Sequence, residues 1–174
     1  MRHEDAVQML SVKPGFKNKQ TWADLGCGSG VFTKALADIL QPGSIIYAVD
    51  TDAGSLGAIP SAYNGVIIHQ QKADFVQQLL LPGLVDGILM ANSLHYVKDK
   101  KSFIHKLLST MLPAGKMLLI EYDTDRPVKT WVPYPVSFNS LKTLFPADEF
   151  TVIKLLQRAS VYGSVMYSAM ITRK

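Results

Sequence analysis

The sequence has 174 residues, of which 48% are hydrophobic and 18% are charged, and this composition excludes a disordered chain. A chain of this length buries about 70% of the surface that it exposes when unfolded. We therefore expect a single domain over residues 1–174 with a hydrophobic core. The net charge of +4 comes from scattered lysines and arginines, which argues against a nucleic-acid-binding surface.

The single cysteine, Cys27, cannot form an internal disulfide, which suits a reducing compartment. The first five residues include two acids with no long apolar stretch behind them. No run approaches the roughly 18 consecutive apolar residues that span a bilayer. These features predict a soluble, cytoplasmic protein that does not interact with a membrane.

Apolar runs and their spacing predict strands that alternate with helices in the first half of the chain. In chain order, we expect a helix over 5–12, a strand over 21–25, a helix over 31–40, a strand over 44–49, a strand from 66 to about 74, and a helix over 75–81. The stretch 52–61 contains two glycines and Pro60, so it can form at most a short helix.

The second half continues this alternation and ends in a hairpin pattern. In chain order, we expect a strand over 85–91, a helix over 98–112, a strand over 116–122, an aromatic loop over 123–135, a helix capped by Ser137, and strands over 150–162 and 165–172 joined at Gly163 and Ser164. The alternation predicts an α/β fold with a mainly parallel sheet between two layers of helices. The hairpin adds one antiparallel strand.

The run Asp24-Leu25-Gly26-Cys27-Gly28-Ser29-Gly30 lies between a predicted strand and a predicted helix, as nucleotide-binding turns do. Its G-x-G-x-G spacing differs from the G-x-G-x-x-G of dinucleotide-binding proteins, because position 31 is valine. The Gly-Lys-Ser/Thr of a phosphate-binding loop is also absent. An acid two residues before the first glycine suits a ligand with a positive amino group and no phosphate.

The residues from Ala23 to Gly30 resemble the first motif of class I S-adenosylmethionine-dependent methyltransferases. Later landmarks follow in the expected order, so the resemblance covers nearly the whole chain, and it is closest to the small methyltransferase domains of types 11 and 25. The resemblance implies a Rossmann-like, doubly wound sheet of seven strands in the order 3-2-1-4-5-7-6. It also implies an enzyme that transfers a methyl group from S-adenosylmethionine to an acceptor.

The resemblance further implies where the cofactor binds. Asp50, twenty residues after Gly30, occupies the place of the acid that binds the ribose hydroxyls, although a plain turn aspartate is the alternative. Asp74 occupies the place of the acid that accepts the adenine amino group, and it could also cap the next helix. The full expected set is Asp24, Gly26, Cys27, Gly28, Asp50, Thr51, Asp74, Phe75 and Asn92.

Four members of this set carry more specific expectations. Asp24 is expected to face the methionine amino group, or else to cap the glycine turn. Phe75 either lies along the adenine ring or packs in the core. Asn92, after the fourth strand, is expected to line the cofactor chiefly through its backbone. Cys27 is interpreted as a packing residue.

His95 is the candidate catalytic residue, because a histidine can deprotonate an oxygen or nitrogen acceptor near neutral pH. A structural or solvated histidine is the alternative. Aromatic residues nearby could wall an acceptor pocket or simply pack on the edge of the sheet; they are Tyr96, Tyr122, Trp131 and Tyr134.

The acceptor is expected to be a small molecule. Enzymes that methylate nucleobase amino groups or protein glutamine usually carry an Asn/Asp-Pro-Pro-aromatic turn after the fourth strand, whereas this chain has Asn92-Ser93-Leu94-His95. We expect no metal site and no nucleic-acid partner, and a homodimer is compatible with the sequence. Two alternatives stay open: a non-enzymatic S-adenosylmethionine-binding protein and an RNA methyltransferase. The glycine spacing disfavours an NAD-dependent oxidoreductase.

Overall fold

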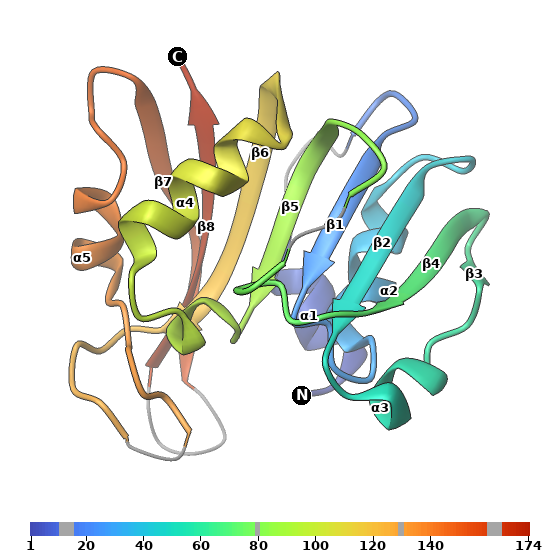
Figure 1. The fold of residues 1–174 in the computed structure, drawn as a ribbon, viewed down its shortest axis with the longest axis horizontal. Coiled ribbons are helices and arrows are strands. Elements are labelled where there is room, and N and C mark those ends of the chain that lie inside the picture. Colours follow the sequence, from blue (N-terminus) through green and yellow to red (C-terminus); the bar gives the residue numbers. More distant parts are fainter. Residues whose placement is uncertain (11–15, 79–80, 129–130, 160–164) are drawn as a thin grey trace.

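The computed structural model of the protein describes residues 1–10, 16–78, 81–128, 131–159 and 165–174. Within these ranges, eight strands form one sheet in the order β3-β4-β2-β1-β5-β6-β8-β7 (Figure 1). The strands are β1 (Thr21–Leu25), β2 (Ile45–Asp50), β3 (Ala62–Tyr63), β4 (Val66–Lys72), β5 (Val85–Ala91), β6 (Met111–Tyr122), β7 (Phe150–Ala159) and β8 (Val165–Arg173).

The predicted strand order is confirmed, with one addition. Strands β4, β2, β1, β5 and β6 pair in parallel, and β8 is antiparallel to both β6 and β7. These seven strands have the order 3-2-1-4-5-7-6, while the two-residue strand β3 adds an antiparallel edge beside β4. The connection predicted at Gly163 and Ser164 lies outside the described residues. Because the parallel strands end at one edge, the segments that follow them gather there.

Helices cover both faces of the sheet, as predicted (Figure 1). Helices α1 (His3–Met9) and α2 (Val31–Ile39) lie behind the sheet in this view, whereas α4 (Lys100–Ser109) and α5 (Phe138–Thr143) lie in front of it. The short helix α3 (Ala53–Gly57) follows β2. Each face has its own buried apolar cluster, so two cores sandwich the sheet.

A close contact joins the central strands β1 and β5. A Cβ atom at Gly87 would lie 2.4 Å from ring atoms of Trp22, so only glycine leaves room for this fully buried indole. The indole nitrogen donates a hydrogen bond to Gln20 Oε1 at 2.9 Å. This packing fixes the two strands whose carboxyl ends carry Asp24 and Asn92.

The helix predicted over 75–81 is wrong for the residues that the structure describes there. The carbonyl of Asp74 accepts hydrogen bonds from the backbone of Gln77 and Gln78, which makes a turn. Of residues 75–78, only Phe75 is buried, so no apolar face stabilises further helical turns. The helix predicted over 98–112 is also shorter, because β6 begins at Met111.

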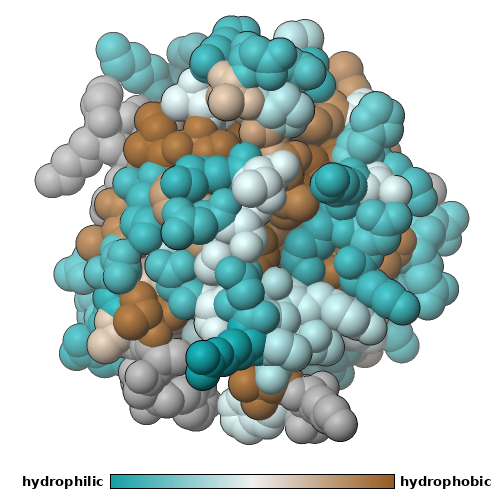
Figure 2. Space-filling model, turned by 90° about the vertical axis from the view of Figure 1, so that its left-hand side faces the viewer, coloured by the Kyte–Doolittle hydropathy of each residue, from teal (hydrophilic) through white to brown (hydrophobic). Residues whose placement is uncertain are grey.

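None of the helices in the described chain has both the length and the apolar character needed to cross a bilayer. The side of the molecule that carries the β7–β8 hairpin shows hydrophilic residues with hydrophobic ones between them (Figure 2). The edge strand β7 likewise combines apolar and charged residues: the exposed Ile153 lies next to Lys154. The charge of Lys154 discourages edge-to-edge pairing with another strand.

Candidate functional site

The glycine turn after β1 is tethered to the end of β2. The backbone N–H groups of Gly26 and Cys27 donate to the carbonyl of Val49 at 2.8 and 3.1 Å. Gly26, Gly28 and Gly30 all have positive φ angles, of 79°, 52° and 81°, which side-chain-bearing residues rarely adopt. The turn therefore needs glycine for its backbone path.

The turn is closed on two sides and open in the middle. A Cβ atom at Gly26 would lie 2.5 Å from Ser93 Cβ, and one at Gly30 would lie 2.7 Å from Ile59 Cγ1. A Cβ atom at Gly28, in contrast, meets no atom within 4 Å. Gly28 is therefore where a ligand can approach the backbone closely.

The carboxylate of Asp50 connects the two strand ends. Its Oδ2 atom accepts the backbone N–H of Gly28 at 2.8 Å, and its Oδ1 atom accepts that of Asp52 at 3.0 Å. Each carboxylate oxygen has a second lone pair, so both retain the capacity to accept a bond from a ligand. The neighbouring residue in the predicted set, Thr51, is exposed.

Asp24 is fully buried and only half satisfied. Its Oδ2 atom accepts the hydroxyl of Thr33 at 2.6 Å, whereas Oδ1 has no hydrogen-bond partner among the described residues. Burial raises the pKa of Asp24 to about 7; the Thr33 bond opposes this shift, and the charge of Asp50 adds to it. A buried carboxylate oxygen without a partner is costly, so this position favours a ligand that donates a hydrogen bond and carries positive charge.

A second unpartnered oxygen lies at the end of the neighbouring strand β5. Asn92 has a φ of 55°, and its backbone N–H donates to the carbonyl of Ile120 at 2.8 Å. Its buried Oδ1 atom has no partner within the part of the chain that is described. Because β1 and β5 are paired, the two unpartnered oxygens of Asp24 and Asn92 belong to adjacent strands at the same edge.

The structure shows a capping contact for Asp74 and a core position for Phe75. Asp74 caps its turn, since Oδ1 accepts the backbone N–H of Val76 at 2.9 Å. Phe75 is a buried core residue whose ring lies 5.8 Å from that of Phe103. Its Cε1 atom also lies 3.3 Å from the Cβ position of Gly26, so the ring borders the glycine turn.

Cys27 is buried within the turn, and its thiol donates a weak hydrogen bond to the carbonyl of Gly28 at 3.7 Å. Burial, together with the nearby charges of Asp24 and Asp50, raises the pKa of the thiol far above its ordinary value. A protonated, buried thiol is a poor nucleophile, which fits the packing role predicted for Cys27.

His95 is paired with a residue that the sequence analysis missed. Its Nδ1 atom lies 2.7 Å from Glu121 Oε2, and its backbone N–H donates to Glu121 Oε1 at 3.2 Å. The two residues are 2% and 1% exposed. Histidine 95 lies in the 3₁₀ turn η1 (Leu94–Tyr96), and Glu121 lies near the end of β6. An acid within the apolar run 116–122 was the one available signal.

The loop after β6 is fixed beside His95. The backbone N–H of Tyr134 donates to the carbonyl of His95 at 3.0 Å, and Lys100 Nζ donates to the carbonyl of Tyr134 at 2.6 Å. Burial lowers the pKa of Lys100, and the charge of Glu121 partly opposes this shift. Tyr96 and Trp131 are more than half exposed, so each presents an aromatic surface to its surroundings.

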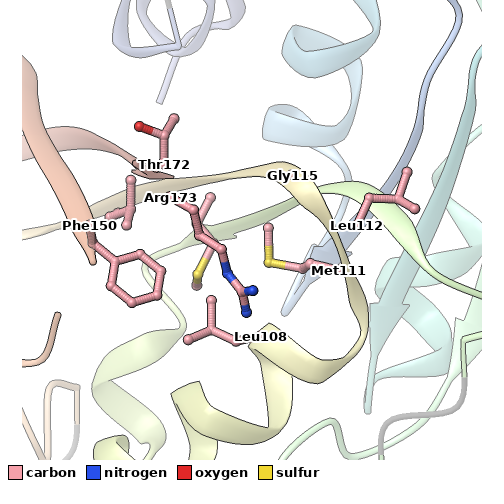
Figure 3. A pocket seen from close by; sticks show the side chains of 9 residues that line it. Leu108, Met111, Leu112, Gly115, Phe150, Thr172 and Arg173 are labelled. Atoms are coloured by element: carbon pink, nitrogen blue, oxygen red, sulfur yellow. The ribbon is translucent and has the colours of Figure 1, made fainter. Parts of the chain in front are cut away.

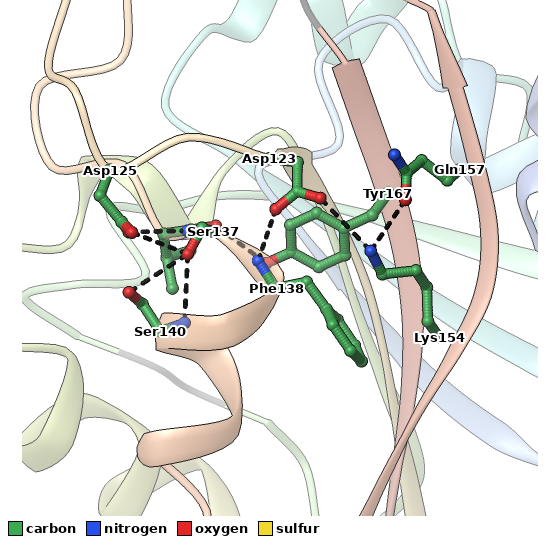
Figure 4. A network of polar contacts seen from close by, with 9 residues as sticks. Asp123, Asp125, Ser137, Phe138, Ser140, Lys154, Gln157 and Tyr167 are labelled. Carbon is green, nitrogen blue, oxygen red and sulfur yellow. Dashed lines mark hydrogen bonds and ion pairs between the residues drawn. The ribbon is translucent and has the colours of Figure 1, made fainter.

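A polar network anchors the two ends of that loop to α5 and the hairpin (Figure 4). Asp123 accepts the backbone N–H of Phe138 at 2.8 Å and lies 3.3 Å from Lys154 Nζ. Asp125 accepts both the backbone N–H and the hydroxyl of Ser137, the residue predicted to cap α5. The loop thus has defined ends.

Two described cavities lie at the opposite edge of the sheet, near the start of β6 and the end of β8. One has a volume of about 10 Å³ and is bordered by side chains such as Leu108, Met111 and Phe150 (Figure 3). That volume suits a single water molecule at most. The other is an open groove of about 560 Å³ between α4 and α5. Neither includes a residue of the predicted cofactor set.

Two curated relatives share 25% identity with this chain. One is an uncharacterised methyltransferase of Mycobacterium bovis, aligned over 122 residues, which are 70% of this chain and 59% of that protein. The other is probable polyketide synthase 5 of Dictyostelium discoideum, aligned over 120 residues, which are 68% of this chain and 4% of that protein. The chain thus spans only part of the length of these relatives.

Solved structures share the fold at low sequence identity. The plantazolicin methyltransferase BpumL, in complex with a triazolic desmethylPZN analog and SAH, has a TM-score of 0.71 at 10% identity, covering 99% of this chain and 84% of that one. Coclaurine N-methyltransferase, bound to N-methylheliamine and SAH, has a TM-score of 0.73 at 13% identity, covering 99% and 72%. The N-methyltransferase NodS from Bradyrhizobium japonicum WM9 has a TM-score of 0.70 at 16% identity, covering 99% and 85%.

A family model described as a methyltransferase domain matches residues 3–159. This range includes the glycine turn, Asp50, Asp74, Asn92 and the His95–Glu121 pair. The match confirms the family that the motif resembles: the chain belongs to the methyltransferase-domain family.

Proposed function

We propose that this protein transfers a methyl group from S-adenosylmethionine to a small-molecule acceptor. The observation that carries the proposal is the pair of unpartnered buried oxygens, Asp24 Oδ1 and Asn92 Oδ1, beside the open position at Gly28. Protein oxygens that accept no hydrogen bond within the described chain fit a ligand that brings hydrogen-bond donors and a positive charge. A pyrophosphate would meet repulsion from these oxygens instead.

Different residues at this edge would bind different parts of the cofactor. Asp24 would hold the methionine ammonium, because its Oδ1 atom is buried without a partner in the described chain and belongs to a carboxylate that is negative when ionised. Asp50 would accept the ribose hydroxyls with its remaining lone pairs, and Asp74 would accept the adenine amino group. Phe75 borders the adenine position, and Asn92 lines the methionine moiety. The backbone of Gly26, Cys27 and Gly28 and the exposed Thr51 complete the set.

When bound, S-adenosylmethionine supplies an already activated methyl group on a sulfonium. The task left to the protein is to align an acceptor with that group and to exclude water. The loop that ends at Ser137 and the aromatic residues near η1 supply a border for the acceptor. His95 stays the candidate catalytic residue.

A small acceptor is supported by the fold relatives, of which coclaurine N-methyltransferase was solved with N-methylheliamine. The polar contacts of the loop ends also keep the acceptor side structured, which suits a compact ligand. We propose no nucleic-acid partner, since the 18 lysines and arginines are offset by 14 acids. A homodimer stays compatible with these features.

The first test is a thermal shift with S-adenosylhomocysteine beside NADH. At a ligand concentration 100-fold above the dissociation constant, binding adds about 2.7 kcal/mol to the free energy of unfolding. For a protein of this size, the expected rise in Tm is about 5–10 °C. A rise with NADH and none with S-adenosylhomocysteine would contradict the proposal.

The second test separates a small-molecule methyltransferase from the two alternatives, an RNA methyltransferase and a non-enzymatic binding protein. Transfer of a labelled methyl group is measured with a metabolite extract and with total RNA as acceptors. Label in small molecules supports the proposal, and label in RNA with salt-sensitive binding supports an RNA methyltransferase. Tight cofactor binding with no label in either pool supports a non-enzymatic binding protein.

A further inference from the structure

We propose that His95 takes a proton from the acceptor and that Glu121 positions it, so that the acceptor's reacting atom arrives as a hydroxyl of phenol-like acidity. This inference rests on the proposed function, because it assigns the acceptor class of the same site. Its evidence is the geometry of the pair, the burial of both side chains and the residues that surround them.

One carboxylate fixes His95 at two points. Glu121 Oε2 lies 2.7 Å from the ring Nδ1 atom, and Glu121 Oε1 accepts the backbone N–H of the same histidine at 3.2 Å. A carboxylate that holds both the backbone and the ring leaves the imidazole little freedom to rotate. Such a carboxylate also selects the tautomer, because it accepts a proton from Nδ1.

The second ring nitrogen is the functional one. With the Nδ1 proton directed to Glu121, the Nε2 atom of neutral His95 carries a lone pair. Within residues 1–10, 16–78, 81–128, 131–159 and 165–174, no hydrogen-bond partner of this Nε2 atom occurs. A basic nitrogen with no partner in the described chain fits a substrate that brings a proton.

The position of the pair places it next to the cofactor residues. His95 lies three residues after Asn92, in the turn that leaves β5. Glu121 lies one residue after Ile120, whose carbonyl binds the backbone of Asn92. The base and the cofactor-facing amide thus share one strand end, and Tyr134 closes the other side of His95 through its backbone N–H.

Several titratable groups face the pair from the surrounding elements. The rings of Tyr96 and Tyr122 lie 4.4 and 6.3 Å from that of His95. Lys100 of α4 and Tyr167 of β8 also lie near the pair, because the charge of Glu121 contributes to the pKa shifts of both residues. The aromatic rings among these residues provide flat apolar surface, which suits an aromatic acceptor.

A purely structural pair is the competing explanation, in which Glu121 only pins the η1 turn to β6. A buried carboxylate is an expensive way to do this, since a neutral amide could hold the same backbone N–H. An amine acceptor that arrives neutral reacts through its free lone pair and needs no base in the site. A hydroxyl acceptor does need one, because its oxygen is a weak nucleophile until it loses the proton.

The proposed step balances as follows. The acceptor oxygen forms a bond to the methyl carbon while the carbon–sulfur bond breaks, and the bonding pair stays on sulfur. The hydroxyl proton moves to His95 Nε2, so the imidazolium is formed beside the carboxylate of Glu121. The products are a methyl ether, S-adenosylhomocysteine and one proton, which His95 then releases to solvent.

The test compares His95→Gln and Glu121→Gln with two matched controls, His105→Gln and Glu149→Gln, which change the same residue types far from the glycine turn. All four variants should bind S-adenosylhomocysteine within about threefold of the wild type. If the wild type does not bind S-adenosylhomocysteine, the proposed function itself is wrong. Loss confined to the two site variants would assign the pair a structural role and overturn the inference.

Two readouts then separate proton transfer from structural support. Nitrogen NMR of the His95 ring with bound S-adenosylhomocysteine should show Nδ1 protonated and Nε2 unprotonated at pH 8, and Glu121→Gln should disturb this tautomer. Protonated Nε2 in the neutral wild-type ring would overturn the inference. The controls should leave the His95 signals unchanged.

The acceptor panel is phenol, catechol and 4-nitrophenol, with benzylamine as the amine comparison. We expect methylation of a hydroxyl, a fall in kcat of about 100-fold or more in His95→Gln with little change in KM, and a smaller fall in Glu121→Gln. Methylation of no hydroxyl in the panel would overturn the acceptor class.

Discussion

The hydroxyl of Thr33 donates to one carboxylate oxygen of Asp24 at 2.6 Å, and the other oxygen of Asp24 faces no donor in the described chain. The bond joins α2 to β1 directly behind the glycine turn. It leaves the carboxylate half satisfied in a fully buried position. A bound cation would complete the site, so the protein without ligand carries a cost that ligand binding removes.

The first prediction concerns this cost. Burial raises the pKa of Asp24 from 3.8 to about 7. The folded protein therefore binds more protons than the unfolded chain between these two values, and the free energy of unfolding falls as the pH rises from about 4 to about 7. Asp24→Asn removes this loss, so the variant should be more stable than the wild type by roughly 2–4 kcal/mol at pH 8.

Urea denaturation at several pH values checks this expectation. The difference between Asp24→Asn and the wild type should grow from pH 4 to pH 7 and stay constant above that. The exposed Asp148, changed to Asn, should give no such pH-dependent difference. An Asp24→Asn variant that is less stable than the wild type at pH 8 would show that the buried charge is already compensated.

The second prediction concerns ligand affinity. An ammonium group binds the ionised form of Asp24, so binding must remove the proton that the carboxylate holds below about pH 7. The affinity for S-adenosylhomocysteine should therefore fall below that pH, by up to about tenfold per unit. Calorimetric titration between pH 5.5 and 8.5 measures the slope. Asp24→Asn should bind weakly at every pH and show no slope; a wild-type affinity independent of pH would contradict the role.

The sequence already identified most of the residues of the proposed cofactor side of the site. Motif spacing identified the glycine turn and Asp50, and the structure places these two segments in direct hydrogen-bond contact through Gly28. These features were predictable because a sharp turn requires glycine at fixed positions. The alternation of strands and helices predicted the mainly parallel sheet. The strand order itself came from the resemblance to class I methyltransferases.

The acceptor side was less accessible to sequence reasoning. Glu121 lies 26 residues after His95, and only the parallel pairing of β5 with β6 brings the two together. Thr33 was likewise missed, because its contact depends on how α2 packs on β1. The predicted helix at Phe75 failed for a local reason: the capping contacts of Asp74 support one turn, and no further apolar residue in the described segment extends it.

The third prediction uses two glycines of the same turn. A Cβ atom at Gly26 would overlap Ser93, so Gly26→Ala should lower the free energy of unfolding by more than 2 kcal/mol. A Cβ atom at Gly28 meets no protein atom within 4 Å and costs only its positive φ, about 1 kcal/mol. Gly28→Ala should therefore fold and yet bind S-adenosylhomocysteine poorly.

Denaturation and calorimetry on both variants separate the two effects, with Gly57→Ala as a control that has ordinary φ and open space. Gly57→Ala should match the wild type in affinity. Wild-type affinity in Gly28→Ala would mean that the ligand does not approach the backbone at this glycine.

The final prediction compares two neighbouring acids. In Asp50→Asn, the side-chain amide can accept only one of the two backbone N–H bonds from Gly28 and Asp52, and its NH₂ group opposes the other. The variant also loses the charge that would hold the ribose hydroxyls, so its affinity for S-adenosylhomocysteine should fall on the order of 10- to 100-fold. Asp52→Asn is the matched control, because Asp52 caps α3 through Gly54 and Ser55, and asparagine caps equally well. Its affinity should stay within about twofold of the wild type. Equal losses in both variants would mean that a general loss of negative charge, and not a specific bond from Asp50, controls binding at this edge.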